Sequence, residues 1–343
     1  MKTKIDQKSK PPGSLGYLED LALQVGAIQG TEEPVIRHPH IVVFAGDHGI
    51  SATGLVNPYP QSITGAMVRN FVQGGAAINV FCRQNQLGLK VVDAGVNADL
   101  RDLETHPGFL SLKLGWGTRN YLEGPAMHFE ETERAIALGK LVIENLAREG
   151  CNTVGLGEMG IGNSSSASLL MSAFLHLPLE KTVGKGTGAN EEQLNVKRST
   201  LERVFERHRS IVQLHSPLKT LQYFGGYEIA MMTGAYLAAA EQKMVIVVDG
   251  FIATAALLVA HAISPAVLQH CIFAHCSGEQ GHHRMLHWLG ARPLLNLGLR
   301  LGEGTGAALA MPLLQNAVRF VGEMSSLSDL DIPAARDESI RSL

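Results

Sequence analysis

The chain of 343 residues is 45% hydrophobic, which is enough apolar material to bury a large core and excludes a disordered protein. Its formal net charge of −3, with Lys and Arg scattered along the chain, excludes an extended surface for nucleic acid. The four cysteines, Cys82, Cys151, Cys271 and Cys276, have no paired spacing, so we expect no disulfide framework and a cytoplasmic location.

Five β-branched runs, followed by glycine or an acid and then by helical patterns, predict an α/β fold with a parallel sheet covered by helices. The predicted strands are 40–45, 89–92, 153–156, 244–248 and 271–274. The predicted helices are 129–149, 165–175, 191–208, 227–242, 252–262, 279–289 and 305–323. In such folds ligands bind outside the carboxyl ends of the strands, so the turns there are the candidate sites.

We expect no membrane partner. The N-terminal segment is polar and lacks an apolar run behind its lysines, so it does not resemble a secretory signal. The most apolar stretch, 244–260, contains Asp249 and Gly250 and is shorter than the roughly 20 apolar residues that span a bilayer.

Asp47 and His48 follow the first predicted strand. At this position their side chains either bind a substrate or hold the turn through hydrogen bonds to the backbone.

The glycine-rich segment 155–166 lies between a predicted strand and a predicted helix, where backbone N–H groups can bind a phosphate. It contains the dinucleotide pattern G-x-G-x-x-G from Gly155 to Gly160, but the acid that NAD binding requires about 20 residues on, at the end of the next strand, has no good candidate, because Glu180 lies in a predicted loop. Asn163 or Ser164 could instead simply cap the helix. We favour a phosphate turn that carries Glu158 beside a sugar.

A second glycine cluster, 184–190, precedes the helix that contains Lys197. It lacks the Gly-Lys-[Ser/Thr] ending of a P-loop, so ATP chemistry is not indicated. The cluster either lines a ribose phosphate or is a structural turn.

The segment 275–287 brings His283 and His287 one helical turn apart, near Cys276. A zinc site is one interpretation, but neither H-E-x-x-H nor C-x-x-C is present, and we predict no metal. The portion from Ser277 to Glu279 could cap the helix.

Glu303 stands between glycines at the start of the last predicted helix. It either stabilises the helix dipole or, since glycines allow a substrate to approach closely, accepts a proton.

Together these segments resemble the nicotinate-nucleotide:dimethylbenzimidazole phosphoribosyltransferase (CobT) family. The resemblance covers about residues 10–323, in ordered motifs that are more specific in combination than any one glycine pattern. The motifs are KPPGSLGYLE (10–19), FAGDHG (44–49), GGAAIN (74–79), GEMGIGN (157–163), FGGYE (224–228), VDGF (248–251), SGE (277–279) and RLGEGTGA (300–307).

The resemblance implies a Rossmann-like parallel sheet flanked by helices, with a small second domain built from the two chain ends. We expect the small domain at 1–30 and 290–343, the catalytic domain at 31–289, and a homodimer. The implied reaction moves ribose 5-phosphate from nicotinate mononucleotide to 5,6-dimethylbenzimidazole or a related base, without a cofactor. A redox enzyme or a non-catalytic homologue that binds a base or nucleotide remains an alternative.

The resemblance also assigns residues to roles. Glu303 is the implied catalytic base, and Glu158 is a second acid near the ribose. The implied nucleotide- and phosphate-binding residues are Gly157, Met159, Gly160, Ile161, Gly162, Asn163, Ser164, Lys197, Asp249 and Gly250. The implied base pocket contains Asp47, Ser62, Met67, Ser277 and Leu301. Gly65, Ala66 and Met67 stand where the family often has a glutamine after the threonine, so we expect a different base preference.

Overall fold

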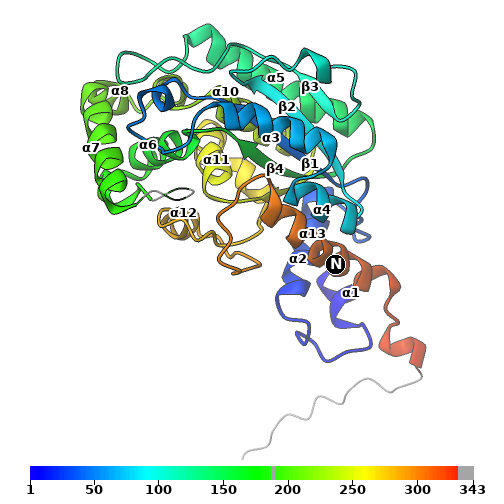
Figure 1. The fold of residues 1–343 in the computed structure, drawn as a ribbon. Coiled ribbons are helices and arrows are strands. Elements are labelled where there is room, and N and C mark those ends of the chain that lie inside the picture. Colours follow the sequence, from blue (N-terminus) through cyan, green and yellow to red (C-terminus); the bar gives the residue numbers. More distant parts are fainter. Residues whose placement is uncertain (185, 187, 189, 331–343) are drawn as a thin grey trace, which may run out of the picture. The chain divides into compact units, whose positions relative to one another are not determined.

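The computed structural model describes residues 1–184, 186, 188 and 190–330 (Figure 1). Its described residues form a six-stranded parallel sheet with the order β3-β2-β1-β4-β5-β6. The strands are β1 (His40–Gly46), β2 (Gly88–Gly95), β3 (Phe109–Ser111), β4 (Thr153–Met159), β5 (Val245–Val248) and β6 (Cys271–Phe273). The predicted α/β class is confirmed.

The strand order reverses between β1 and β4. His40 of β1 is paired with Gly88 of β2 on one side and with Val154 of β4 on the other. The chain therefore builds the sheet outward from β1 first to one edge and then, from β4, to the other edge. The carboxyl ends of β1 and β4 form the switch point at which ligands of open α/β sheets bind.

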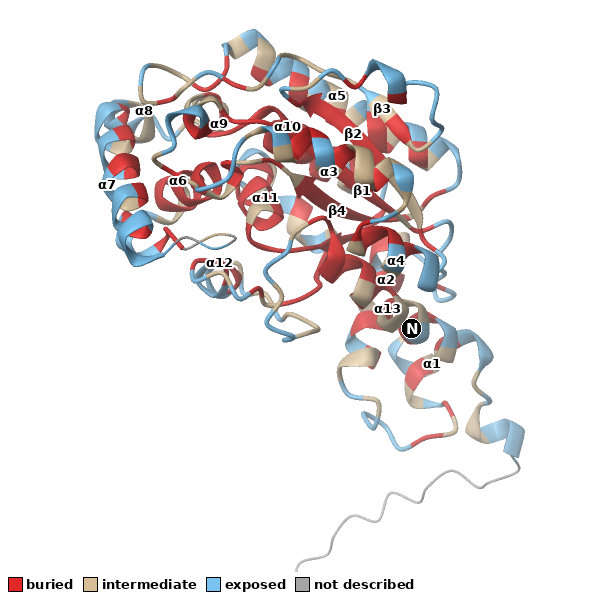
Figure 2. Ribbon diagram, viewed as in Figure 1, coloured by how far each residue is buried: buried red, intermediate tan, exposed pale blue. Residues whose placement is uncertain are grey.

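Helices pack against the sheet because its strands are apolar on both faces. The helices of the described residues are α1 (Lys2–Asp6), α2 (Tyr17–Gln29), α3 (Ser62–Gln73), α4 (Ala77–Gln84), α5 (Phe129–Arg148), α6 (Asn163–Leu175), α7 (Glu191–Arg207), α8 (Arg209–Gln213), α9 (Pro217–Phe224), α10 (Tyr227–Glu241), α11 (Phe251–Ile263), α12 (His282–Trp288) and α13 (Thr305–Glu323). Figure 2 shows buried residues throughout β1, β4, α10 and α11. Alternate strand residues such as Val42, Phe44 and Leu156 share a core cluster with residues of α10, as the two-residue period of a strand requires.

The predicted elements are all present, with some different ends. β4 continues to Met159, three residues beyond its predicted end, and α12 begins at His282 and not at 279. Sequence patterns missed β3 and the helices outside the apolar periodic segments, α1 to α4, α8 and α9. Most of these are short elements, for which single-sequence periodicity is weak.

Two compact units divide the chain: Met1–Ile36 with the described residues from Pro312 onward, and Arg37–Met311. The first unit has its own small core of Ile5, Ala22 and Val321. The second contains the sheet. The predicted domain boundaries, at residues 30 and 290, stay a prediction.

No helix in the described part of the chain is long and apolar enough to cross a membrane.

Candidate active site

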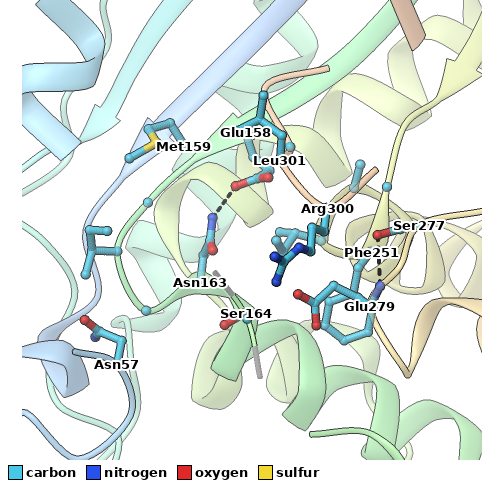
Figure 3. Close-up of a pocket in the computed structure, with 18 of the residues that line it drawn as sticks. Asn57, Glu158, Met159, Asn163, Ser164, Phe251, Ser277, Glu279, Arg300 and Leu301 are labelled. Atoms are coloured by element: carbon cyan, nitrogen blue, oxygen red, sulfur yellow. Dashed lines mark hydrogen bonds between the residues drawn. The ribbon is translucent and has the colours of Figure 1, made fainter. Parts of the chain in front are cut away.

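A cavity opens at the carboxyl ends of β4, β5 and β6 (Figure 3). The described lining residues are 56–59, 158–164, Gly186, Lys197, 249–253, His275, Ser277, Glu279 and 300–302. Most of the predicted nucleotide-binding residues are therefore brought together in one wall.

Glu158 brings a carboxyl group to the cavity from the end of β4. Gly157, Glu158 and Met159 belong to the strand, so their predicted place in a turn is wrong. Asn163 Nδ2 donates a hydrogen bond to Glu158 Oε2 (Figure 3). Burial, reinforced by other carboxyls of which Asp249 acts most strongly, raises the pKa of Glu158 to about 8 despite this bond. At neutral pH the group is mainly protonated and can donate a hydrogen bond to a ligand.

The β4–α6 turn, Gly160–Ser164, is held by side chains that follow β1. The Ile161 N–H donates to Thr64 Oγ1 at 3.1 Å, and Ile161 O accepts from Ser51 Oγ at 2.9 Å. Gly162, with φ of 100°, is the N-cap of α6. The alternative in which Asn163 or Ser164 is the cap is therefore wrong. The turn places the positive end of α6 at the cavity wall.

Lys197 supplies a buried cation beside this turn. Its Nζ donates to Ser164 Oγ at 3.0 Å and to Gly184 O at 3.4 Å, and only 2% of the residue is exposed. Burial lowers the pKa of Lys197 to about 8, against the attraction of Glu279. An ammonium group and a helix N-terminus together favour an anionic ligand.

Only part of the second glycine cluster, 184–190, lies within the described residues. Gly186 lines the cavity, whereas Lys185, Thr187 and Ala189 lie outside the described residues. The two interpretations of this cluster stay predictions.

Glu303 lies on a strained turn. Gly302, Glu303 and Gly304 have φ values of 88°, 63° and 79°, so a residue with a side chain adopts the left-handed region that favours glycine. Its N–H donates to Glu158 O at 3.2 Å. Gly157 permits this approach, because a Cβ there would lie 2.4 Å from Glu303 C. Backbone strain of this kind is concentrated at functional sites.

The Glu303 carboxylate has different surroundings from that of Glu158. Its Oε2 accepts a hydrogen bond of 3.4 Å from the N–H of Ile78, the second residue of α4. Burial raises the pKa of Glu303, while the Ile78 N–H opposes the rise by stabilising the ionised form. Glu303 and Gly157 do not line the cavity, although Leu301 and Gly302 do. Two buried acids thus lie side by side at the end of β4.

Asp249 and Gly250 reach the cavity from the end of β5. Asp249 Oδ1 accepts a hydrogen bond of 2.9 Å from Ala307 N–H and lies 3.7 Å from His275 Nε2. Burial raises the pKa of Asp249, and His275 and the backbone N–H groups oppose the rise.

Of the five residues predicted for a base pocket, Ser277 and Leu301 line the cavity, and the other three do not. Asp47 is fully buried and accepts hydrogen bonds from Thr64 Oγ1 at 2.6 Å and Asn97 N–H at 2.8 Å. This is the turn-holding arrangement that the sequence left open. Ser62 and Met67 lie on α3, outside the cavity lining.

Sequence reasoning missed several lining residues as site residues. Arg300 points its guanidinium into the cavity, toward the space between Asn163 and Glu279 (Figure 3). Within the described residues it has no hydrogen bond or ion pair. Its place in the RLGEGTGA motif, three residues before the glycine-flanked Glu303, was the available signal. Phe251 is the last residue of the VDGF motif, which was its signal, whereas the loop 56–59 carried none beyond turn composition.

The histidine segment does not form a metal centre in the described chain. No group of three or more His, Cys, Asp or Glu residues there could hold a metal ion. His282, directly before His283, accepts from Ser277 N–H at Nδ1 (2.8 Å), and its Nε2 lies 3.0 Å from Thr254 Oγ1. Burial lowers the pKa of His282 to about 3, so this ring is neutral and structural. The N-cap of α12 is Gly281, so Ser277–Glu279 does not cap it.

Comparison with known proteins gives a consistent result. A family model described as "Phosphoribosyltransferase" matches residues 1–332. The nicotinate-nucleotide–dimethylbenzimidazole phosphoribosyltransferase of Cupriavidus necator is 51% identical over 96% of this chain and 94% of its own length. Its namesake in Shewanella putrefaciens is 52% identical over 96% and 93%. The crystal structure of CobT from Thermus thermophilus superposes with a TM-score of 0.91 at 42% identity, over 97% of this chain and 98% of that one.

Proposed function

This chain belongs to the family of nicotinate-nucleotide–dimethylbenzimidazole phosphoribosyltransferases, and we propose that it performs their reaction with Glu303 as the base and Glu158 as a neutral acid at the ribose. The resemblance found in the sequence is thereby confirmed. The enzyme moves ribose 5-phosphate from nicotinate mononucleotide to dimethylbenzimidazole or a related base, a step in building the lower ligand of cobalamin. The products are α-ribazole 5′-phosphate and nicotinate.

The chemistry explains which groups the protein must supply. The pyridinium nitrogen of the donor already carries a positive charge, and it leaves with the electron pair of its bond to C1′ as neutral nicotinate nitrogen. A benzimidazole nitrogen attacks C1′ from the opposite face, so a β-nucleotide becomes an α-ribotide. The other ring nitrogen must lose its proton. Leaving-group activation is built into the donor, so the protein needs mainly to position both reactants and accept one proton.

The adjacency of two unlike buried acids carries this assignment. Glu158 has a pKa of about 8 and is mainly protonated at neutral pH, which makes it the weaker candidate for the proton acceptor. Glu303 accepts the N–H of Ile78 at the positive end of α4, which favours its ionised form. We therefore assign the proton transfer to Glu303 and a hydrogen bond to the ribose to Glu158.

The donor has two anionic groups, and the described cavity lining has two strongly basic side chains. Lys197 with the β4–α6 turn suits the 5′-phosphate, which needs N–H groups and a cation. Arg300 suits the carboxylate of the nicotinate ring, because a guanidinium can bind a carboxylate through two hydrogen bonds. Asp249 and Gly250 are proposed to contact the nucleotide between these two ends.

The acceptor base is proposed to enter on the side of α3 and α4. Glu303 reaches the first turn of α4, and the predicted base-contacting residues Ser62 and Met67 lie on α3, the preceding helix. Leu301 and Ser277 would contact the base from the cavity wall.

We also propose that the enzyme is a cytoplasmic homodimer with a small domain from both chain ends. The dimer and the small domain rest on the family resemblance. None of the four cysteines, all in the described residues, forms a disulfide, which suits a reducing compartment. Sedimentation equilibrium tests the dimer, and a monomeric mass would contradict it.

Incubation of the protein with nicotinate mononucleotide and a panel of bases tests the function. We expect a mass increase corresponding to ribose phosphate on dimethylbenzimidazole, with release of nicotinate. The panel should include benzimidazole, adenine and a phenol, because the acceptor pocket decides among them. Binding of both substrates without any product would favour a non-catalytic homologue.

A further inference from the structure

A buried histidine, His48, joins three elements next to the β4–α6 turn. Its Nε2 lies 2.6 Å from Glu228 Oε1, and both side chains are completely buried. Its Nδ1 lies 3.0 Å from Ser166 Oγ. His48 follows β1, Ser166 is in α6 and Glu228 is in α10. The ring therefore fixes the start of α6 to two other elements of the sheet region.

Ser166 and Glu228 hold the two nitrogens of the His48 ring. Ser166 Oγ donates to Gly225 O at 3.3 Å, which leaves its oxygen free to accept from the His48 Nδ1–H. His48 Nε2 faces Glu228 Oε1 at 2.6 Å. A fully buried pair of this kind is stable only while both partners are present, because removing one leaves the other uncompensated.

The backbone and Cβ of His48 contact the turn. His48 O accepts from Gln61 Nε2 at 2.8 Å and from Ser51 Oγ, and Ser51 Oγ also bonds to Ile161 O at 2.9 Å. A Cβ added to Gly162 would lie 3.3 Å from His48 Cβ. Ile161, inside the turn, and Ser166, just after it, are thus connected to the same histidine, Ile161 by way of Ser51.

Two glycines leave the space that the pair requires. A Cβ at Gly226 would lie 2.3 Å from His48 Cε1, and one at Gly46 would lie 2.8 Å from Glu228 Oε2. The FGGYE segment, to which no role had been assigned, is explained by this requirement. His48, Ser166 and Glu228 do not themselves line the cavity.

We propose that His48 and Glu228 form a positioning pair that holds the β4–α6 turn in the geometry that binds the donor nucleotide. The pair touches neither substrate and acts through Ile161, Gly162 and Ser166. The inference rests on the proposed function in one respect, namely that this turn binds the donor.

Steady-state kinetics of Glu228→Ala, Glu228→Gln and Ser166→Ala test the pair, with nicotinate mononucleotide and dimethylbenzimidazole varied in turn. Glu228→Ala should raise the KM for the donor at least about tenfold and leave the KM for the base within about threefold. Glu228→Gln should restore most of the donor affinity, since its amide can donate to His48 Nε2 while Nδ1–H still serves Ser166. Ser166→Ala should raise the donor KM by a smaller factor.

His208→Ala is the matched control. Like His48, His208 is a buried histidine outside the cavity lining. Its Nε2, however, lies 2.8 Å from Tyr121 O, which is not part of the β4–α6 turn. Its replacement should lower Tm without changing the KM for the donor. A donor KM that rises as much in His208→Ala as in Glu228→Ala, or rises equally for donor and base, would overturn the positioning role.

Ser166→Ala provides a second test if the Glu228→Ala protein does not fold. Ser166→Ala keeps the buried pair and removes the Ser166 hydroxyl with its bonds to His48 Nδ1 and Gly225 O, so its donor KM then decides: a rise supports the proposal and an unchanged value overturns it. Calorimetric titration with nicotinate mononucleotide alone measures the affinity for the donor without turnover. If the wild type transfers ribose phosphate to no base, the proposed function fails, whereas donor affinities of the same variants still decide on the pair.

Discussion

The two sides of the proposed reaction are built differently. On the donor side, the β4–α6 turn is fixed by the hydrogen bond that Ile161 N–H donates to Thr64 and by the one that Ile161 O accepts from Ser51. On the acceptor side, Glu303 is held by its own left-handed backbone and by the single N–H of Ile78. The donor side thus presents a turn held at two points to a large charged ligand, whereas the acceptor side presents one carboxylate in a fixed position.

This difference matches what each substrate needs. Nicotinate mononucleotide carries a phosphate, a ribose and a carboxylate, so its binding depends on a preformed array of hydrogen-bond donors and cations. A benzimidazole is flat, neutral and mostly apolar, so it needs an apolar surface and one proton acceptor. Variants on the donor side should therefore change the KM for the donor or the choice of donor. Variants on the acceptor side should change kcat or the choice of base.

The largest expected effect is that of Glu303→Gln. The amide keeps the size and can still accept the Ile78 N–H, but it cannot take a proton. We expect kcat to fall by about 10²–10⁴-fold, the usual contribution of a general base, with little change in Tm. Steady-state kinetics with dimethylbenzimidazole and thermal unfolding measure the two quantities.

An N-methylated benzimidazole provides the control for Glu303, because it has no proton to lose. Its turnover should be nearly the same in the wild type and in Glu303→Gln. An equally large loss with this base would mean that Glu303 orients the substrate or holds the turn, and the search for the base would move to Glu158.

Arg300→Gln should change the choice of donor. If the guanidinium binds the nicotinate carboxylate, kcat/KM for nicotinate mononucleotide should fall by about 10–100-fold, and that for nicotinamide mononucleotide by less than about threefold. Arg284→Gln, at an exposed position outside the cavity lining, is the matched control and should change neither value. Equal losses with both donors would assign Arg300 to the shared phosphate.

Glu158→Gln should have a smaller effect at neutral pH but should remove a pH dependence. The wild type requires the protonated carboxyl, so its kcat/KM should decline as the pH rises through about 8, where Glu158 ionises. Glutamine cannot ionise, so the variant should show a shallower decline, to which Lys197 with its pKa of about 8 still contributes, and its activity at neutral pH should be within about tenfold of the wild type. Profiles of kcat/KM against pH for both proteins measure this. A decline as steep in the variant as in the wild type would assign the ionisation elsewhere.

The same pKa predicts a change in stability. The folded pKa of Glu158 lies above its ordinary value of 4.5, so its contribution to stability is fully present below that value and is lost as the pH rises through about 8. Glu158→Gln should therefore lose less stability than the wild type between neutral and alkaline pH. Urea denaturation at the two ends of this range measures the free energy of unfolding.

Much of the fold follows from local patterns. The strands 40–45 and 153–156 were visible because buried parallel strands are continuous apolar runs, and α10 and α13 were visible from their length. The helices α3 and α4 were not, because they are short and separated by Gly74 and Gly75. β3 has only three residues and is defined by its pairing with β2, which no local pattern contains.

The site was predictable where its residues share one sequence segment. Glu158 and the β4–α6 turn are contiguous, so glycine content and position after a strand were sufficient signals. The surroundings of Glu303 were not visible, because Ile78 is 225 residues away. The same holds for the pairing of His48 with Glu228, which are 180 residues apart and meet only after β1 and α10 have packed.

The smallest expected effect, that of Met67→Gln, tests whether the acceptor side lies along α3. Met67 is partly buried there and outside the donor cavity, so the KM for nicotinate mononucleotide should not change. A glutamine adds hydrogen-bonding groups where a thioether adapts to a flat ring, so the ratio of kcat/KM for dimethylbenzimidazole to that for adenine should shift by about 2–10-fold. Met67→Leu keeps the site apolar and should preserve the wild-type ratio. If Met67→Gln and the wild type have the same base profile, Met67 does not contact the base, and the acceptor must approach Glu303 along α4 without touching this part of α3.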